Sequence, residues 1–352
     1  ATLTPIDSEI VKSVLLEMVY EAGIDLLLYT VPIAPIMEGS RVTGLRMLGK
    51  AGELFCYAKM VVDATGDGDI LAQTVAPMRT RLSPKGTQPA TLMFQLGNVD
   101  LDVVAEVMNE EFIYGRKAGE SSESVVCIQG NFGAWDDKVE AEGLFADKRH
   151  AIWFTSIRRG FADINVTRIL AVDPSDPRDL TRAEMEGRRQ MHRVIEFLRK
   201  YVKGFEDAFL VHAAPFVGLR DSRHIVGRSQ LTQQIVMSGE RPEDVIAYGS
   251  YAKDIHDPAG EGITLDAVCP TGYGIPLSAC IPMTVSGVLA CGRTLDADEQ
   301  AFASVRVMAT LMAVGQGVGV AAALSAQSGL APSELGDKLH QVLTEQNAFI
   351  GP

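Results

Sequence analysis

The sequence predicts an α/β protein of two domains, in which the two ends of the chain form one domain around a middle one. Its 352 residues allow two domains at roughly 100 to 200 residues each. An apolar run enters a glycine-rich turn at residues 60–69. The short apolar strands and apolar helix that characterise residues 1–86 appear again in residues 263–352. Residues 87–262 hold many charges and both tryptophans, so we assign them to a second, mixed α+β domain.

The composition is that of an ordinary globular protein and excludes several classes. Hydrophobic residues make up 47% and charged residues 22%, which argues against disorder and coiled coils. A net charge of −13 without a basic patch makes nucleic acid an improbable partner. The five cysteines form no CxxC pair, so we expect no metal site and no disulfide framework. A reducing cytoplasm fits this cysteine pattern best. The first ten residues, ATLTPIDSEI, lack the positive and apolar regions of a signal peptide, so we expect none.

The first elements predicted are a helix, a strand and a small meander. Asp7 or Ser8 can cap a helix over residues 9–22, where apolar positions recur at helical spacing. The apolar residues 24–30 predict a buried strand. Strand-like runs over 31–37, 41–48 and 53–57, separated by glycine-containing turns, predict the meander.

A strand, a tight turn and a helix follow over residues 60–64, 65–69 and 70–75. The strand ends in Asp63, and the turn contains Gly66 and Asp67. Glycines at the end of a buried strand let backbone amides approach a ligand, and a carboxylate there can bind a sugar hydroxyl. The alternative is a tight strand-to-helix turn without a ligand.

In the middle domain, Thr181 and Glu184 have the spacing of a capping box, which predicts a helix to about Tyr201. Near the C-terminus, residues 288–291 predict a strand, and a helix is expected from about Ser304. No charged residue stands between Arg306 and Glu334, a stretch long enough to span a membrane. Because it is rich in Ala, Gly, Ser, Thr and Gln, we predict a buried helix and no membrane partner.

A second group of candidate site residues combines arginine and histidine: Arg220, Arg223, His224 and His256. Two arginines beside a histidine in an acidic protein suit a carboxylate or phosphate of a cofactor or substrate. Either histidine could transfer a proton. The alternative is an Arg–Asp network that only orders a bend.

A third group lies near the C-terminus and comprises Gly292, Arg293, Arg306 and Met308. A helix that begins near Ser304 offers free amides and a positive dipole end to an anion. Gly315 and Gly319 share one face of that helix, which indicates close approach of a strand, a helix or a cofactor. Simple close packing is the alternative.

Five motifs in succession carry a family resemblance: VVDATGDGD, GLRDSRHIVG, KDIHDP, YGIPLSACIP and the segment from LACGR to SAQSG. Together they resemble the FAD-dependent oxidoreductase family of the glutathione-reductase-like superfamily, whose members are often labelled by similarity to the heterodisulfide reductase A subunit. Order and spacing agree over essentially the whole chain. The resemblance implies a partial glutathione-reductase-like FAD-binding domain (1–86 and 263–352) and a substrate domain (87–262). It places these residues on the flavin side: Asp63, Gly66, Asp67, Gly292, Arg293, Arg306 and Met308.

The sequence also departs from the family pattern. The strand, GxGxxG turn and helix with which the family opens are not found in these 352 residues, so we expect FAD to bind them weakly or not at all. Asp296, Asp298-Glu299 and Phe302 stand where Ser, Thr-His and His are usual, and Asp221 replaces a usual glutamate. The cysteines of an iron–sulfur cluster are not evident.

The function expected from the resemblance is hydride transfer between a small-molecule substrate and FAD. Arg220, Arg223 and His256 would orient an anionic or polar substrate, and His224 or His256 would move a proton. The alternative is a catalytically silent truncated or split-subunit remnant that binds a partner carrying the missing segment. A small-molecule binding module without redox activity is a third reading. We also expect an exposed strand edge and hence a homo-oligomer or such a partner.

Overall fold

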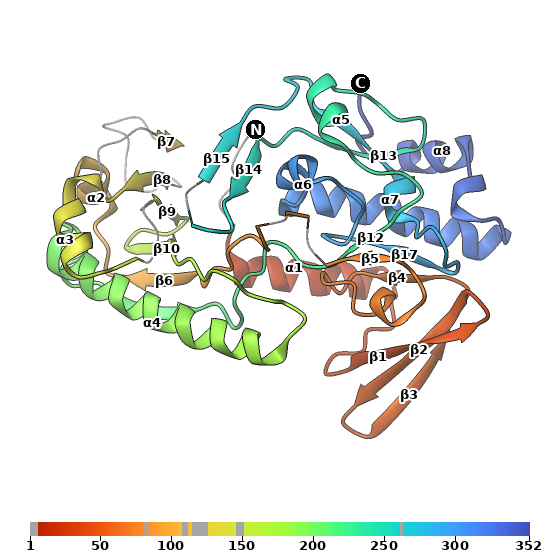
Figure 1. Cartoon of the computed structure of the whole chain (residues 1–352), viewed down its shortest axis with the longest axis horizontal. Helices are drawn as coiled ribbons and strands as arrows, with labels where there is room; N and C mark the ends of the chain where they lie inside the picture. Colours follow the sequence, from red (N-terminus) through yellow and green to blue (C-terminus); the bar gives the residue numbers. More distant parts are fainter. Residues whose placement is uncertain are drawn as a thin grey trace.

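The computed structural model describes residues 6–80, 82–83, 85–107, 112–114, 126–145, 151–260 and 263–352. Figure 1 shows a sheet with helices packed around it on the left, a helical part on the right, and the meander projecting at the lower right. The described residues combine helices and strands, as the predicted α/β class requires.

The first helix, α1 (Ser8–Glu21), confirms the prediction for residues 9–22. Asp7 caps it, because its carboxylate accepts from the amides of Glu9 and Ile10. No residue of α1 is buried. Residues 24–30 form no strand in the structure, and Ile24 and Leu28 are more than half exposed. The prediction of a buried strand there is wrong, because within the described residues no neighbouring strand pairs with this run.

The meander is confirmed as an antiparallel sheet in the order β1–β2–β3. Its strands are β1 (Val31–Glu38), β2 (Arg41–Gly49) and β3 (Gly52–Tyr57). The turn at Gly39 and Ser40 joins β1 to β2, and Gly39 has a φ of +58° there, which explains why a glycine is needed. These contacts are local in sequence, since each strand pairs with the next one along the chain.

Two strands from opposite ends of the chain lie side by side. β4 (Val61–Asp63) pairs in parallel with β17 (Val288–Ala290), so that Val61 faces Val288 and Asp63 faces Ala290. Both strand predictions are confirmed. The helix predicted over 70–75 is only a 3-10 turn, η1 (Leu71–Gln73). It stops because Thr74 is extended, three residues before Pro77.

Within the described residues, the middle of the chain forms an antiparallel sheet in the order β11–β6–β10–β9–β8–β7. Its strands are β6 (Phe94–Gly97), β7 (Phe112–Tyr114), β8 (Val126–Asn131), β9 (Ala151–Ser156), β10 (Phe161–Asn165) and β11 (Phe209–Ala213). The accompanying helices are α2 (Leu101–Val107), η2 (Gly133–Trp135), α3 (Asp136–Ala141) and α4 (Pro177–Tyr201). Buried residues from Ala90 to Val217 form one core cluster here.

Helix α4 begins before the predicted capping box. Asp176 caps it by accepting from the Arg178 amide, and Pro177 occupies its first turn. The Thr181 hydroxyl instead donates to the Pro177 carbonyl inside the helix. The capping-box prediction is therefore wrong, although the end at Tyr201 is confirmed.

The C-terminal part has its own core, built from Leu231 to Ile350. Its paired strands are β5 (Met78–Arg79) with β12 (His224–Ile225), β13 (Val245–Gly249) with β16 (Tyr273–Pro276), and β14 (Lys253–His256) with β15 (Ile263–Asp266). Its helices are α5 (Gln233–Ser238), η3 (Leu277–Cys280), α6 (Glu299–Val305), α7 (Met308–Ser328), η4 (Pro332–Glu334) and α8 (Asp337–Glu345). The division into domains at 86 and 262 stays a prediction.

The helix expected from Ser304 is two helices. Asp298 caps α6, which ends at Val305, and the extended Val307 separates it from α7. The prediction of a helix start near Ser304 is thus wrong, because Ser304 lies in the last turn of α6. Among the described residues, α7 is the one helix with the length and composition of a membrane span, and half of that stretch is buried in the protein. Its buried face, including Val314 and Val318, belongs to the C-terminal core.

The glycines of α7 divide between two faces. A Cβ on Gly317 would lie 2.6 Å from Ile246 Cβ of β13, whereas a Cβ on Gly319 would have no atom within 4 Å. Gly315 would meet only Cys291 Sγ, at 3.8 Å. Close approach of a strand is therefore real, but it occurs at Gly317 rather than at Gly315 and Gly319.

Candidate functional site

The glycine-rich turn after β4 is held by Asp63. This buried carboxylate accepts from the hydroxyl and amide of Thr65 through Oδ1, and from the amides of Ile70 and Leu71 through Oδ2. Both of its oxygens are therefore engaged inside the turn. That arrangement explains the turn's shape, and an additional contact of Asp63 with a cofactor stays a prediction.

Two arginines from distant parts of the chain form hydrogen bonds and ion pairs with the glycine-rich turn. Arg293 Nη2 donates to Asp67 Oδ1 at 2.9 Å and lies against Gly66, which has a φ of +84°. Arg223 Nε donates to the Asp67 carbonyl at 2.8 Å, and its Nη2 pairs with the Asp69 carboxylate. Burial raises the pKa of Asp69, and the charge of Arg223 opposes that effect. Arg223 thus orders the glycine-rich turn.

Arg293 also lines a cavity of about 340 Å³, which we call the arginine cavity. Its walls are Leu219, Arg220, Arg293, Arg306, Met308, Leu311 and Met312. Four of these residues were predicted from the sequence, and they come from three separate segments of the chain. The leucines and Met312 were missed, because nothing in their local pattern indicates a cavity.

Behind the arginine cavity lies a buried ionic cluster. Arg306 Nη2 donates to the carbonyl of Asp254 at 2.7 Å and to its Oδ2 at 3.1 Å. His256 Nε2 lies 3.2 Å from Asp254 Oδ1. Arg220 Nη1 donates to the Pro89 carbonyl at 2.6 Å. Asp254 was missed from the sequence, although alternation along β14 puts it on the same face as His256.

The cluster shifts the pKa values of its members. Burial lowers the pKa of Arg220 to about 9, helped by the charge of Arg306. Burial also lowers the pKa of His256 to about 4, against the hydrogen bond to Asp254, so its imidazole is neutral at pH 7. Burial raises the pKa of Asp254, but His256, Arg306 and Arg220 outweigh this and lower it overall. Asp254 is therefore a carboxylate between cations.

Two donors on the cavity wall lack a partner within the described residues: the Nε atoms of Arg293 and Arg306 are buried and make no hydrogen bond. His256 Nδ1 is also buried without a partner, but it is an acceptor, because the neutral imidazole donates through Nε2 to the Asp254 carboxylate. Helix α7 begins at Met308, on the cavity wall, without a side chain capping its first turn. The cavity therefore presents unused donors and positive charge, which suit an anionic or carbonyl-bearing planar group.

His224 lies outside the arginine cavity. It is fully buried, its Nε2 lies 2.8 Å from Asp221 Oδ1, and its ring meets Phe302 edge-on with centroids 4.7 Å apart. Three of the positions where the family pattern differs, Asp221, Asp296 and Phe302, are also buried, and Asp296 pairs with Arg79 at 2.5 Å. A catalytic role for His224 stays a prediction.

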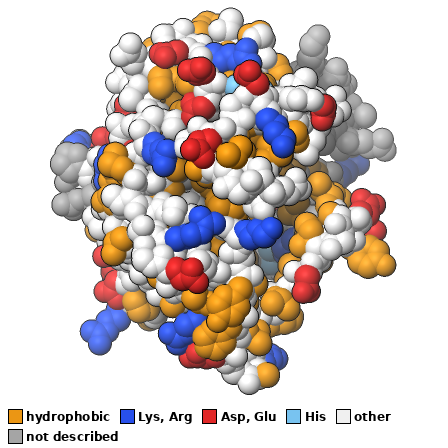
Figure 2. Space-filling view, turned by 90° about the vertical axis from the view of Figure 1, so that its right-hand side faces the viewer, with side chains coloured by type: hydrophobic (Ala, Val, Ile, Leu, Met, Phe, Trp, Pro, Cys, Tyr) orange, Lys and Arg blue, Asp and Glu red, His pale blue; other side chains and the backbone are white. Residues whose placement is uncertain are grey.

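The face of the molecule that lies on the right of Figure 1 carries acidic and basic side chains mixed with small apolar patches (Figure 2). No large patch of one sign is visible there, so this face gives no support to a polyanionic partner.

Solved structures of FAD-dependent enzymes and related proteins resemble this chain over most of its length. The chain is 12% identical to a geranylgeranyl bacteriochlorophyll reductase-like protein from Thermoplasma acidophilum, over 96% of this chain and 58% of that one, with a TM-score of 0.46. It is 12% identical to a myxobacterial chondrochloren halogenase, described as a variant of the FAD-dependent halogenases, over 98% and 57% of the two chains, with a TM-score of 0.47. The chain thus spans less than two thirds of either. A comparison with curated proteins gave no significant match.

The profile of the family described as FAD dependent oxidoreductase matches residues 1–345. This confirms the broad resemblance and, with the mixed helices and strands, the predicted α/β FAD-binding fold class. The narrower likeness to the heterodisulfide reductase A subunit stays a prediction. The chain belongs to the FAD dependent oxidoreductase family.

Proposed function

We propose that the protein is a flavin-dependent oxidoreductase, and that the arginine cavity takes the polar edge of the FAD ring system. The observation that carries this proposal is the pair of buried, unpartnered Nε donors on Arg293 and Arg306. Buried donors without partners are costly, and a group with ring nitrogens and carbonyl oxygens would satisfy them.

The residues present fit that group. The cavity combines three guanidinium groups with Met and Leu side chains, and its 340 Å³ is near the lower end of small-molecule sites, which run from about 300 to 1,000 Å³. It therefore suits a ring system rather than a whole dinucleotide. The glycine-rich turn, fixed by Asp63 and gripped by Arg293, lies directly beside it.

Each residue has a distinct task in this proposal. When bound, FAD would supply the hydride chemistry with a small-molecule substrate. Arg293 and Arg306 would donate to the cofactor's anionic edge. Asp254 holds Arg306 in place, and His256 in turn holds Asp254, so we regard both as positioning residues. Arg220 would orient an anionic substrate from the other wall.

Titration of the protein with FAD, followed by quenching of flavin fluorescence, tests this proposal. We expect Arg293→Gln to weaken FAD binding about tenfold, since a charge-assisted hydrogen bond is worth roughly 1.5–3 kcal/mol. The control is Arg46→Gln, which removes a surface pair with Glu53 in the meander. Equal affinity of the wild type and Arg293→Gln would contradict the assignment. Weak FAD binding by these 352 residues alone stays a prediction, as does a cytoplasmic location.

One observation favours a second candidate, a partner that completes the protein. Helix α1 buries none of its residues, and Ile10, Val14 and Met18 are each at least half exposed. Within the described residues, β4 pairs with β17 alone. An added segment or a second copy would cover such a surface. Light scattering tests this: we expect self-association that Val14→Lys with Met18→Lys abolishes, and a monomer at all concentrations would contradict it.

A further inference from the structure

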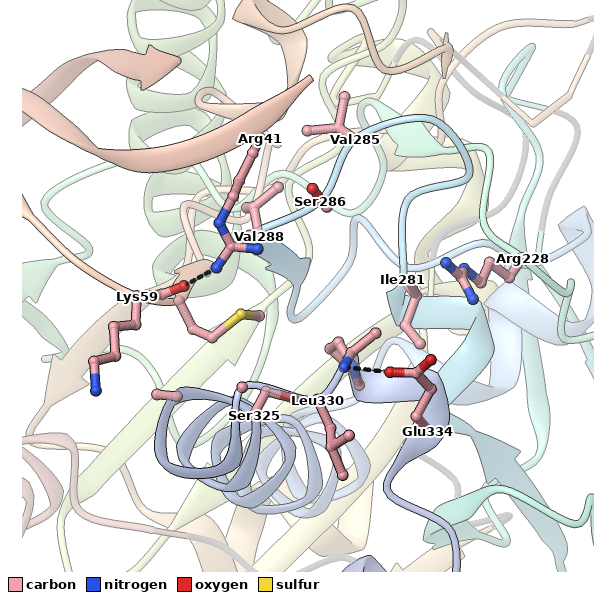
Figure 3. Close-up of a pocket in the computed structure, with 16 residues that line it drawn as sticks. Arg41, Lys59, Arg228, Ile281, Val285, Ser286, Val288, Ser325, Leu330 and Glu334 are labelled. Carbon is pink, nitrogen blue, oxygen red and sulfur yellow. Dashed lines mark hydrogen bonds between the residues drawn. The ribbon is translucent and has the colours of Figure 1, made fainter. Parts of the chain in front are cut away.

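A second cavity of about 330 Å³ lies at the opposite end of the β4–β17 pair. The arginine cavity includes Arg293, which follows the carboxyl end of β17, whereas the second cavity includes Lys59 and Met60, which precede β4. Figure 3 shows the C-terminal turns of α7 and the segment around Glu334 closing it from the other side. We call it the distal cavity. Nothing proposed above for FAD uses it.

The walls of the distal cavity are largely apolar. Met60, Ile281, Val285, Val288 and Leu330 contribute aliphatic or thioether surface. Such walls favour a ligand with an apolar body, because contact with them removes hydrocarbon from water. A sugar or a free inorganic ion would leave them unused.

The charged groups on the rim favour an anion. Three cations, Arg41, Lys59 and Arg228, stand against one carboxylate, Glu334, in a protein whose net charge is −13. Arg228 Nη1 is already bonded to the Ser333 hydroxyl at 2.6 Å, and Glu334 Oε2 accepts from the Ala331 amide at 2.8 Å. Figure 3 shows the Lys59 ammonium turned away from the others. Arg41 is thus the best anchor.

Arg41 is fixed yet has free capacity. Its Nη2 donates to the Lys59 carbonyl at 2.7 Å, and within the described residues its Nε and Nη1 make no hydrogen bond. A guanidinium group presents such donors in a planar fork that matches a carboxylate. A phosphate dianion fits less well, because Glu334 and the negative end of α7 border the same space.

Ser325 marks a second polar contact point. This residue of α7 is only 4% exposed, lines the distal cavity, and its Oγ has no hydrogen-bond partner within the described residues. Ser328, one turn later, bonds its hydroxyl to the Leu324 carbonyl at 2.7 Å instead. A buried hydroxyl without a partner is unfavourable, so a ligand group that hydrogen-bonds to the Ser325 hydroxyl would be stabilised in this cavity.

We propose that the distal cavity binds a small hydroxy-carboxylate with an apolar body. The carboxylate pairs with Arg41, the body lies against Val285, Val288 and Leu330, and the hydroxyl group bonds to Ser325. This is a binding site separate from the arginine cavity, and it stands whether or not FAD binds there.

Three probes of equal chain length separate the parts of this proposal: 6-hydroxyhexanoate, hexanoate and 1,6-hexanediol. Isothermal titration calorimetry gives each affinity, and the rise of Tm with probe concentration gives an independent measure. We expect 6-hydroxyhexanoate to bind most tightly, in the millimolar range usual for ligands of about this size. Hexanoate should bind more weakly, and the uncharged diol weakest. Failure of all three to bind overturns the proposal, as does a diol that binds as tightly as the hydroxy acid.

Variants with matched controls test the two contacts. Arg41→Gln should weaken both carboxylates about tenfold or more, whereas Arg46→Gln, on the same strand but outside the cavity, should change neither. Ser325→Ala should weaken 6-hydroxyhexanoate and leave hexanoate unchanged, whereas Ser328→Ala should affect neither. If Arg41→Gln does not fold, Arg41→Lys keeps the charge and should retain part of the affinity. If Arg41→Gln or Ser325→Ala binds 6-hydroxyhexanoate with the wild-type affinity, the assignment is overturned.

Discussion

Arg306 and Asp254 form a buried pair in which one guanidinium nitrogen contacts both the main chain and the side chain of its partner. Arg306 Nη2 lies 2.7 Å from the Asp254 carbonyl oxygen and 3.1 Å from Oδ2. The second carboxylate oxygen of Asp254 faces His256. One residue of β14 therefore fixes an arginine that follows α6, and this places Arg306 on the wall of the arginine cavity.

Asp254→Asn should destabilise the protein strongly. Removing one partner leaves the buried Arg306 uncompensated, which typically costs about 3–5 kcal/mol. Urea unfolding measures the difference. Glu53→Gln breaks the exposed pair with Arg46 and should cost about 1 kcal/mol or less. Similar losses for the two variants would show that the buried pair adds nothing special.

Stability should fall as the pH drops from about 6.5 to about 4, because burial lowers the pKa of His256 to about 4 from its usual 6.5. In that range His256 binds a proton in the unfolded chain but stays neutral in the folded protein. Its contribution to the free energy of unfolding is therefore complete above pH 6.5 and is lost as the pH falls to the pKa of the folded protein. The full loss is about 3 kcal/mol. The lowered pKa of Asp254 acts only at lower pH still.

Urea unfolding at a series of pH values, compared between wild type and His256→Gln, measures this loss. The variant should have a flatter profile between pH 4 and 6.5. Parallel profiles would assign the acid sensitivity to other groups.

Arg223→Ala should loosen the glycine-rich turn. The side chain bonds to the Asp67 carbonyl and pairs with the Asp69 carboxylate, so its removal frees two points of the turn that Arg293 and Gly66 also share. We expect faster hydrogen exchange of the amides of residues 66–69 and weaker FAD binding. Exchange mass spectrometry checks the first effect. If exchange in the turn is unchanged, Arg223 contributes no more to the stability of the turn than an exposed ion pair does, roughly 0–1 kcal/mol.

Gly317 and Gly319 should respond to alanine in opposite directions. A Cβ on Gly317 would come 2.6 Å from Ile246 Cβ and 2.8 Å from its carbonyl oxygen, so Gly317→Ala should cost about 1–3 kcal/mol through overpacking. A Cβ on Gly319 meets nothing within 4 Å, so Gly319→Ala should stabilise α7 by about 0.5–1 kcal/mol. Urea unfolding distinguishes the two. The same sign for both would contradict the packing described.

The sequence predicted elements whose determinants are local. The meander was predicted because its short strand-like runs and the glycine-containing turns between them, such as that at Gly39, act over a few residues. β4 was predicted because its apolar run enters the glycine-rich turn that Asp63 holds. The break between α6 and α7 was missed, since Val307 and Met308 are as compatible with a helix as their neighbours. It results from Asp298 starting α6 early and from Arg306 turning toward Asp254.

The candidate site was predicted only in part for the same reason. Arg293, Arg306 and Met308 stand close together in sequence, and the arginine cavity includes all three. The contacts of Arg223 with Asp69, and of Arg306 with Asp254, join positions that no local pattern relates. Residue types alone could not separate Arg220, on the cavity wall, from His224, inside the core.

The pairing of β4 with β17 also determines the order in which this chain can fold. Val61 leaves the ribosome more than two hundred residues before its partner Val288, a delay of about 10 to 45 s at usual rates of synthesis. The middle sheet, in which β8, β9 and β10 are neighbours in sequence, can form during that interval, whereas β4 must wait with its edge open. The nascent chain is therefore most exposed to aggregation and to chaperone capture until β17 has been made.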